Sequence, residues 1–212
     1  MGADEEEALH ATSHDVRTDL NQRVSRSSEM TLSNLTIRPA EKGDAESIAS
    51  VHVQSWVEAY TGLLPDEMIS RFNVSERTMN WTTLLSDLSE SQNGCVYVAQ
   101  TDGQTCGFIC AVPQRDDALQ AQGFSAEMAA VYVLQSAQRQ GVGRALMRKA
   151  AEHLVSSGHR GASLWVLDTN APARRFYEAL GGSPVGKRED VRPNATLHEI
   201  AYGWPDLLLL SR

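Results

Sequence analysis

One short segment brings two glycines together with several basic side chains, and this combination could bind a phosphorylated ligand. The segment consists of Gln138, Arg139, Gln140, Gly141, Val142, Gly143 and Arg144. Without side chains at 141 and 143, backbone N–H groups can approach an anion closely, and a helix that begins here would add a partial positive charge. With Arg148 and Lys149 close by, the segment favours a ligand with several phosphates, although a glycine-rich helix start that binds nothing would show the same pattern.

Two other phosphate-binding patterns fit this sequence poorly. Leu146 replaces the third glycine of the dinucleotide-binding pattern G-x-G-x-x-G, and no acid-bearing second strand follows at the required spacing. Residues 181–187 match the nucleotide-binding pattern G-x-x-x-x-G-K, but Arg188 stands where a Ser or Thr would bind magnesium. We therefore expect residues 181–187 to form a turn that ends the preceding helix.

The elements that must position these residues follow from the spacing of hydrophobic side chains. Alternation predicts strands at 35–39, 127–134, 162–167 and 197–203, and a hairpin of strands 95–101 and 105–112 around Asp102-Gly103. Helical spacing predicts helices at 44–60 with Asp44 as N-cap, at 67–72, from a Ser75 cap to about 88, at 140–157 and at 171–180. The expected order is strand, helices, hairpin, two strand–helix units and a last strand.

Composition and charge limit the class of protein. The chain has 212 residues, of which 42% are hydrophobic and 22% charged, which is enough to bury one good core. Residues 1–32 are polar without sustained periodicity and predict a flexible extension, and residues 33–212 predict a single domain. No apolar run is long enough to span a membrane and the first residues are acidic, so we expect a cytoplasmic protein with no membrane partner. The net charge of -8 disfavours nucleic acid as a partner.

The cysteines and histidines give no sign of a metal site. Cys95, Cys106 and Cys110 read as small core residues, and Cys106 and Cys110 are expected on one face of a strand because they are four residues apart. None of them has a histidine at metal-ligand spacing, and the six histidines are scattered along the chain. We therefore predict no bound metal.

Two motifs together resemble those of a known enzyme family. Gln138, Gly141 and Gly143 form Q-x-x-G-x-G after an expected strand, which is similar to motif A of the GCN5-related N-acetyltransferases (GNAT). Asn170, Ala173, Phe176 and Tyr177 form N-x-x-A-x-x-F-Y, which is similar to motif B, at the family's usual distance. The resemblance covers roughly residues 35–204. It implies an α/β fold with a mixed, mostly antiparallel central sheet that is splayed open at the fourth and fifth strands, is flanked by helices and holds acetyl-CoA in the gap.

The resemblance also implies which residues bind the cofactor. Residues 138–144 would hold the pyrophosphate, and the backbone of Val133 and Leu134 would bond the pantetheine arm at the splay. The N–H of Val133 would in addition polarise the thioester carbonyl, where negative charge develops during the attack. Asn170 would bond a pantetheine amide, Arg174 would reach the adenosine phosphate, and Tyr177 would lie near the sulfur.

Catalytic and acceptor residues are implied in the same way, each with an alternative. Glu127, six residues before Val133, would accept the proton of the amine, although an ordinary strand-end carboxylate would look the same. Tyr177 would protonate the leaving thiolate, or else simply pack on the sheet. Trp56, Tyr60 and Tyr132 would bind the acceptor, or else belong to the core.

The function implied is transfer of the acetyl group of acetyl-CoA to a primary amine of a small molecule or a peptide, by direct attack. Two alternatives share the same cofactor residues: an acyl-CoA-binding module without catalysis, and acetyl transfer to a hydroxyl group. The apolar run at Leu207–Leu210 indicates a covered surface, either within the chain or in a homodimer.

Overall fold

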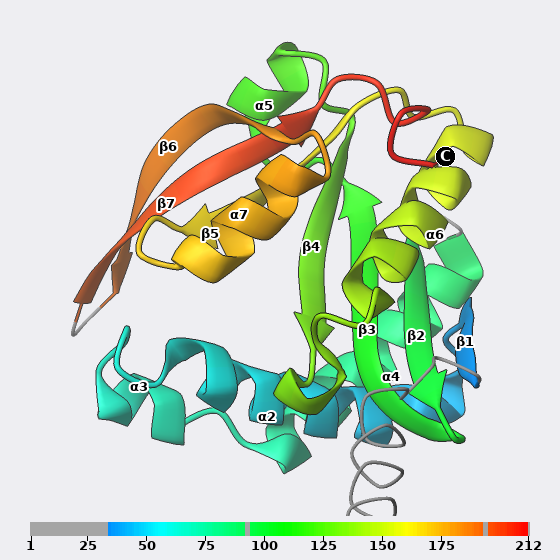
Figure 1. Ribbon diagram of the computed structural model, residues 1–212, viewed down its shortest axis with the longest axis vertical. Coiled ribbons are helices and arrows are strands. Elements are labelled where there is room, and N and C mark those ends of the chain that lie inside the picture. The colour runs from blue at the N-terminus through cyan, green and yellow to red at the C-terminus, as the bar shows by residue number, and fades with distance from the viewer. Residues whose placement is uncertain (1–33, 92–93, 193–194, 212) are drawn as a thin grey trace, which may run out of the picture. The chain divides into compact units, whose positions relative to one another are not determined.

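The computed structural model describes residues 34–91, 94–192 and 195–211, so the predicted extension at residues 1–32 lies outside the described residues. Residues from Leu35 onward are built around one seven-stranded sheet with the strand order β1-β2-β3-β4-β5-β7-β6 (Figure 1). Neighbouring strands run antiparallel except for β4 and β5, which are parallel. The expected class, an α/β fold with a mixed and mostly antiparallel sheet, is confirmed.

The elements have the following bounds. The strands are β1 (Leu35–Pro39), β2 (Cys95–Thr101), β3 (Gln104–Pro113), β4 (Ala126–Val133), β5 (Ala162–Leu167), β6 (Ser183–Arg192) and β7 (Ala195–Trp204). The helices are α2 (Ala45–Tyr60), α3 (Asp66–Ser70), α4 (Val74–Ser91), α5 (Asp117–Ala121), α6 (Val142–Ser156) and α7 (Ala171–Ala179), with short 3-10 turns η1 (Lys42–Asp44) and η2 (Gln135–Ala137).

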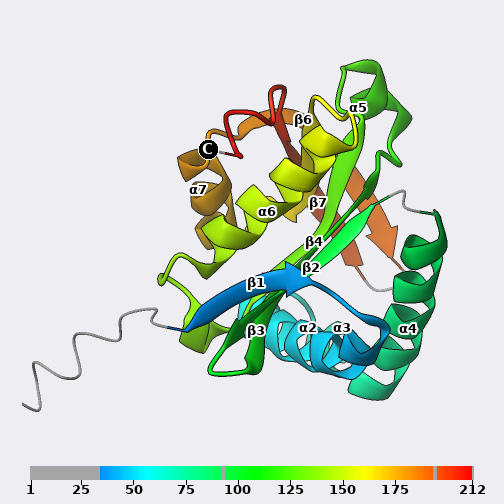
Figure 2. The same cartoon turned by 90° about the vertical axis from the view of Figure 1, so that its right-hand side faces the viewer.

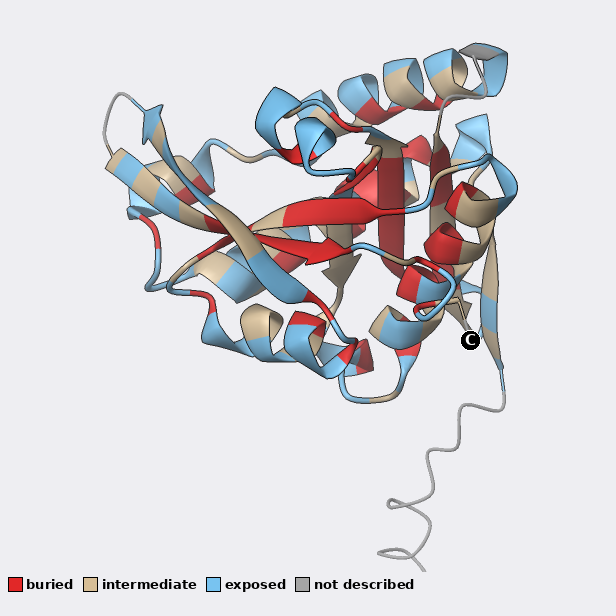
Figure 3. Ribbon diagram, turned by 90° about the horizontal axis from the view of Figure 1, so that it is seen from above, coloured by how far each residue is buried: buried red, intermediate tan, exposed pale blue. Residues whose placement is uncertain are grey.

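Helices cover both faces of the sheet. Helices α6 and α7 lie on one face and α2 and α4 on the other, as Figure 2 shows. The face of α6 toward the sheet carries Val142, Leu146, Ala150 and Leu154, at most 1% exposed, because residues four apart share one side of a helix. The central strands are correspondingly the most buried part of the fold (Figure 3).

The sheet is open between β4 and β5. These strands are in register only at Ala126 with Ala162 and at Glu127 with Ser163, and beyond this point they diverge (Figure 1). The pairing of β3 with β4 has a register irregularity between Cys110 and Ala111, which reorients the rest of β4. The expected splay at the fourth and fifth strands is therefore present.

Helices α2 and α3 reach the second half of the sheet at the open end. Leu64 and Ile69, on the turn and helix after α2, are buried against Leu167 at the end of β5. Trp56 and Tyr60 of α2 pack against the same cluster. This contact places the aromatic end of α2 beside the gap.

One strand was missed by the sequence analysis. Residues 181–187 were expected to form a turn, but residues 183–192 form strand β6. This strand pairs with β7 from Ser183–Gly203 to Arg192–Ala195. The prediction was wrong beyond Gly181–Gly182 because β6 is mostly polar and exposed, so backbone pairing with β7 forms it rather than an apolar face. Helix α5, in the loop expected between residues 113 and 126, was missed as well.

The predicted helix starts were right in position but not in their capping contacts. Helix α4 begins at Val74, and the Asn73 side chain, not Ser75, accepts from the N–H of Glu76 (2.9 Å). Asp44 does occupy the N-cap of α2, yet its carboxylate pairs with Arg38 (2.7 Å) and makes no capping bond to α2. Asn73, two residues earlier, thus takes the role expected of Ser75, and Arg38 of β1 takes up the carboxylate expected to cap α2.

The three cysteines are buried and free. Cys106 and Cys110 were expected on one face, but Cys106 belongs to the cluster under α6 and Cys110 to the cluster under α2 and α4. The prediction was wrong because a register shift between Ala99 and Gln100 leaves Cys106 as an extra residue, which reverses the alternation. Burial raises the pKa of Cys95 and of Cys110 to about 12.

The C-terminal leucines divide between core and surface. Leu207 and Leu210 are buried in the cluster under α6, whereas Leu208 and Leu209 are exposed. Within the described part of the chain, no cluster of His, Cys, Asp and Glu side chains could hold a metal ion. The described helices also include none that is long and apolar enough to cross a membrane.

Candidate active site

The edge of β4 that faces the gap offers backbone donors. The N–H of Leu134 donates to the carbonyl of Cys106 on β3 (2.9 Å). Because successive N–H groups of a strand point to opposite edges, those of Val133 and Val131 point toward β5, which has already diverged. Val133 therefore presents an N–H to the gap, whereas the N–H of Leu134 is already bonded.

The turn after β4 forms a concave set of backbone N–H groups. Arg139 (φ 63°) and Gly141 (φ 85°) adopt the left-handed region, and Ala145 makes the first helical bond to the carbonyl of Gly141 (3.0 Å). The N–H groups of Val142, Gly143 and Arg144, in the first turn of α6, have no carbonyl within the helix to bond. Left-handed residues followed by a free helix start can accept an anion, which is the geometry that a phosphate-binding role for residues 138–144 requires.

Other contacts of this segment shape the turn rather than face a ligand. The side-chain amide of Gln138 donates to the carbonyl of Val133 (3.0 Å), and that of Gln140 donates to the carbonyl of Ser136 (2.9 Å). A Cβ added to Gly143 would lie 3.0 Å from the ring of Phe176 on α7. Gly143 is thus also required for the close contact between α6 and α7, a role that its spacing did not reveal.

Helix α7 positions the second motif. The Asn170 side chain accepts from the N–H of Ala173 (3.2 Å) and so caps α7. Arg174 donates to the carbonyl of Asp168 (2.8 Å) and to the hydroxyl of Tyr202 (3.3 Å). The guanidinium of Arg174 is therefore tied to β5 and β7 in this structure.

Three tyrosine hydroxyls from three elements approach one another. Tyr177 of α7 is 8% exposed, and burial raises its pKa. Burial also raises the pKa of Tyr132 on β4 and of Tyr60 on α2, and the hydroxyl of Tyr132 donates a hydrogen bond to that of Tyr60. The charge of an ionised Tyr60 would raise the pKa of Tyr177 further, so these groups lie close together. All three hydroxyls stay protonated at neutral pH and can act as donors.

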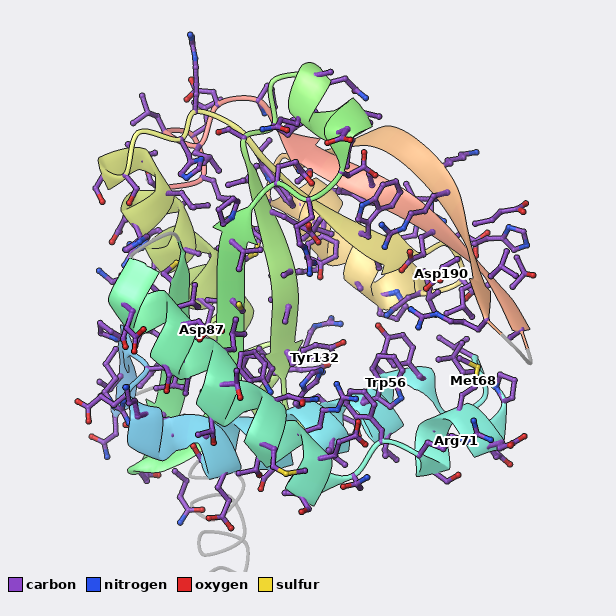
Figure 4. All side chains as sticks on the ribbon, turned by 180° about the vertical axis from the view of Figure 1, so that it is seen from behind. Trp56, Met68, Arg71, Asp87, Tyr132 and Asp190 are labelled. Atoms are coloured by element: carbon purple, nitrogen blue, oxygen red, sulfur yellow. The ribbon has the colours of Figure 1, made fainter. Side chains whose placement is uncertain are left out.

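Aromatic rings line the α2 side of this region. Trp56 stacks on Phe72 with the ring centroids 4.5 Å apart, and it also contacts Tyr60 at 4.4 Å. The guanidinium of Arg77 lies over the ring of Phe72, 4.1 Å from its centroid. The three predicted acceptor residues, Trp56, Tyr60 and Tyr132, are therefore brought together, and Phe72 joins them (Trp56 and Tyr132 are labelled in Figure 4).

His52 was not singled out from the sequence. Its ring lies 4.7 Å from that of Tyr132, and its Nδ1 accepts from the indole N–H of Trp81 (3.2 Å). Burial lowers the pKa of His52 to about 4, with a smaller contribution from the charge of Arg77. The imidazole is therefore neutral at neutral pH, with its proton on Nε2. Its aromatic partners are distant in sequence, so its local sequence does not mark it.

Glu127 lies where β4 and β5 part. Its neighbour Met128 packs under α6, so the side chain of Glu127 points to the opposite face of the sheet, the face that carries Tyr132. The Glu127 side chain is 8% exposed, and both of its oxygens accept from Arg115, at 2.9 Å and 2.6 Å. Arg115 was not predicted, since a single arginine in a polar loop carries no sequence signal.

A pocket of about 450 Å³ lies on the β6–β7 hairpin and the end of β5. Its lining residues are Asp168, Lys187, Arg188, Glu189, His198, Glu199 and Ile200. Two of its charges are paired with each other, since Arg188 donates to Glu199 (2.6 Å), and the His198 ring lies 3.6 Å from the Glu189 carboxylate. It contains none of the predicted site residues.

Comparison with known proteins agrees with this geometry. Residues 55–182 match the model of the acetyltransferase (GNAT) family. An N-acetyltransferase of Bacillus subtilis (strain 168), YuaI, is 35% identical over 178 residues, which is 84% of this chain and 96% of YuaI. An N-acetyltransferase of Archaeoglobus fulgidus is 32% identical over 143 residues, 68% of this chain and 89% of its own length.

Solved structures share the fold. The PaiA N-acetyltransferase of Thermoplasma acidophilum, in complex with coenzyme A, superposes with a TM-score of 0.61 at 21% identity, over 78% of this chain and 98% of that one. YncA of Salmonella typhimurium, with its cofactor acetyl-CoA, gives 0.62 at 20% identity, over 82% and 95%. The splayed sheet of this chain is thus the fold of these acetyltransferases. The chain belongs to the acetyltransferase (GNAT) family.

Proposed function

We propose that this protein transfers the acetyl group of acetyl-CoA to a primary amine by direct nucleophilic attack. The observation that carries the proposal is the free edge of β4. It leads from the anion site at residues 138–144, past the N–H of Val133, to the hydroxyls of Tyr177 and Tyr132. The related structures of PaiA and YncA hold coenzyme A and acetyl-CoA, which supports acetyl-CoA as the cosubstrate here.

Cofactor binding is assigned to the two motifs. The N–H groups of residues 139–144 would receive the pyrophosphate, and the exposed Arg139 and Arg144 would add positive charge. The N–H of Val133 would bond the pantetheine arm and then the thioester oxygen as it gains charge. Asn170 and Arg174 would act mainly by fixing α7, given their bonds to Ala173 and Asp168.

The chemistry needs one base and one acid. An alkylammonium must lose a proton before it can attack, and the Glu127 carboxylate would accept it. The amine nitrogen then forms a bond to the thioester carbon, and collapse of the tetrahedral intermediate breaks the bond from carbon to sulfur. Tyr177, held protonated by burial, would give its proton to the leaving thiolate. It would take up the second proton of the amine nitrogen, directly or through water, so that the products are a neutral amide, a thiol and a neutral tyrosine. The intermediate involves no covalent bond to the enzyme.

The acceptor would enter beside Trp56, Tyr60 and Tyr132, whose rings meet at the end of α2. A small-molecule or peptide amine fits these aromatic side chains, because a ring face attracts a cation and also packs against a carbon chain. We further propose that residues 33–212 act as one cytoplasmic domain with no nucleic-acid or membrane partner.

Binding and turnover measurements test the proposal together. Calorimetry should show that acetyl-CoA binds the purified protein, and a panel of amines screened by thiol release should identify an acceptor. Glu127→Gln and Tyr177→Phe should each lower kcat by about 10²- to 10⁴-fold while the affinity for acetyl-CoA is kept. Glu90→Gln, an exposed position on α4, serves as the matched control.

The outcomes separate the alternatives. A folded protein that ignores acetyl-CoA contradicts the proposal as a whole. Binding of acetyl-CoA without turnover of any acceptor would support the non-catalytic module, and turnover with alcohols but not amines would support transfer to a hydroxyl. Full activity of Glu127→Gln would remove only the assignment of the base.

A further inference from the structure

The general base proposed above is already bonded in the structure. Nε of Arg115 donates to Oε2 of Glu127 (2.9 Å), and Nη2 donates to Oε1 (2.6 Å), so one guanidinium engages both carboxylate oxygens. A general base must lie within hydrogen-bond reach of the proton that it accepts. Arg115 thus takes one lone pair of each oxygen, and because the Glu127 side chain is only 8% exposed, an ammonium group gains access most readily when the guanidinium turns away.

We propose that Arg115 is a positioning residue that fixes both oxygens of Glu127 and occupies the place of the acceptor's ammonium group until the acceptor enters. This inference rests on the proposed role of Glu127. It adds a requirement for the acceptor, which must be a basic alkyl amine that arrives protonated, because its ammonium group takes the place of the Arg115 guanidinium beside Glu127.

Exposure is unequal on the two sides of this ion pair. The Glu127 side chain is 8% exposed and the Arg115 side chain is 65% exposed. A carboxylate this deeply buried loses most of its contact with water and needs a positive partner. Arg115 can instead turn into solvent and remain hydrated. The arginine is therefore the partner that moves.

The backbone next to Arg115 is fixed, so the movement belongs to the side chain. The buried Gln114 donates to the hydroxyl of Ser163 (2.7 Å), and its side-chain oxygen accepts from the N–H of Arg115 (3.1 Å). On the other side, Asp116 caps α5 by accepting from the N–H groups of Ala118 and Leu119. Both neighbours of Arg115 are thus tied to the fold.

Arg115 does not serve as a proton source. Its hydrogen bonds to Glu127 raise its pKa further above the ordinary value for arginine. In the proposed step the acceptor's ammonium gives one proton to the Glu127 carboxylate, which leaves a neutral amine and a neutral carboxyl group, and Arg115 keeps its charge throughout. Among the described residues, the Cys110 thiol of β3 also faces this site, and burial raises its pKa to about 12. That thiol stays neutral in this step.

A measurement that needs no acceptor tests the inference first. Carboxyl signals in ¹³C NMR, assigned by their loss in Glu127→Gln, report the pH at which Glu127 takes up a proton. In Arg115→Gln this midpoint should move up by about 1–3 pH units, because a neighbouring cation favours the charged form. Arg115→Lys should restore most of the difference. Arg188→Gln, which removes a similar pair with Glu199, is the matched control and should leave the midpoint in place.

Kinetics give the second test, with the amine that the panel screen acetylates fastest. In Arg115→Gln the acidic limb of kcat/KM against pH should move to higher pH, and the KM for the amine should fall at high pH because no guanidinium competes for Glu127. Thermal unfolding and calorimetry with acetyl-CoA establish that the variant is folded.

The two proposals fail in different ways. An unchanged midpoint in folded Arg115→Gln overturns the inference, and so does an unchanged acidic limb when Glu127→Gln is inactive. Full turnover by Glu127→Gln would instead overturn the role of Glu127 as base, whatever Arg115 does.

Discussion

Buried groups that can ionise surround the aromatic end of the gap, and burial holds each of them in its neutral form. The pKa of Tyr60, Tyr132 and Tyr177 is raised, and that of His52 is lowered to about 4. A thioester and an amine would therefore meet neutral hydroxyl donors here, while the charges of Glu127 and Arg115 compensate each other nearby. This arrangement suits a reaction in which charge develops only on the thioester oxygen and the leaving sulfur.

His52 predicts a pH dependence of stability. Between about pH 4 and pH 6.5 the unfolded chain binds a proton at this histidine that the folded protein does not bind. The free energy of unfolding should therefore fall as the pH drops through this window, by about 3 kcal/mol over the whole of it. Urea unfolding at several pH values gives the free energy of unfolding against pH for wild type and for His52→Gln. The difference between the two slopes measures the contribution of His52.

The His52 variant loses ring contacts and will be less stable at every pH, so the slope, and not the absolute stability, is decisive. His198→Gln, on the exposed β6–β7 hairpin, is the control and should keep the slope of the wild type. Equal slopes for wild type and His52→Gln would contradict the assignment.

Among single residues, those that belong to local motifs could be identified from the sequence, whereas those defined by partners far away in the sequence could not. Gly141 was singled out because a glycine turn before a helix depends on a few adjacent residues, and Asn170 because it lies in the second motif of the family resemblance; the structure adds that Asn170 caps α7. Arg115 and His52 were missed because their partners, Glu127 and Trp81, lie 12 and 29 residues away. The roles of the implied catalytic residues stay predictions until tested.

Among the elements, α2 is connected directly to the segment that would bind the cofactor. Oε2 of Glu58, near the end of α2, accepts from the N–H of Gln135, the first residue of η2 (2.7 Å). Oε1 of the same carboxylate accepts from the Gln54 side chain (3.0 Å), which fixes its orientation. The helix that carries Trp56 and Tyr60 thus helps to position the turn at residues 138–144.

Removal of this contact should loosen both binding sites together. Glu58→Ala leaves the Gln135 N–H without its partner, and the loss of a hydrogen bond to a charged group corresponds to a weakening of about tenfold. We expect the Kd for acetyl-CoA and the KM for the amine both to rise by about this factor. Calorimetry and steady-state kinetics measure the two effects.

Glu58→Gln keeps an acceptor oxygen and should lie between wild type and Glu58→Ala. Glu46→Ala, at the exposed start of the same helix, is the control. If Glu58→Ala bound acetyl-CoA as tightly as the wild type, the hydrogen bond would have no part in positioning the turn.

Elements with a hydrophobic pattern were predicted well, and elements formed by pairing alone were not. The spacing in α6 and the alternation in β2 and β3 were sufficient, because each buries an apolar face. Strand β6 buries little and exists because β7 pairs with it. The gap itself could be expected only from family resemblance, since the point where β4 and β5 part leaves no trace in their composition.

In the domain as a whole, the β1–β4 half and the β5–β7–β6 half of the sheet share only two register positions, at Ala126 and Glu127. Other contacts between the halves come from the cluster under α6 and from Leu64 and Ile69 against Leu167. A ligand in the gap would contact both halves and add to these contacts. It would also bind only the folded protein.

Acetyl-CoA should therefore stabilise the domain measurably. At a free concentration 100 times its Kd, the added free energy of unfolding is about 2.7 kcal/mol. For a domain of this size that corresponds to a rise in Tm of about 5–10 °C. A thermal melt with and without acetyl-CoA shows this, with sodium acetate as the control. No rise at saturating acetyl-CoA would mean that the gap does not bind it.

The depth at which the cysteines lie has a practical side. Cys95, Cys106 and Cys110 are at most 7% exposed, and the pKa of Cys95 and Cys110 is near 12, so the folded protein offers little cysteine sulfur to a reagent in solution. A chromogenic disulfide reagent added to the folded enzyme would consequently give colour only in proportion to the coenzyme A set free. Its background would rise only when the protein unfolds, so one cuvette would record both the reaction and the integrity of the catalyst.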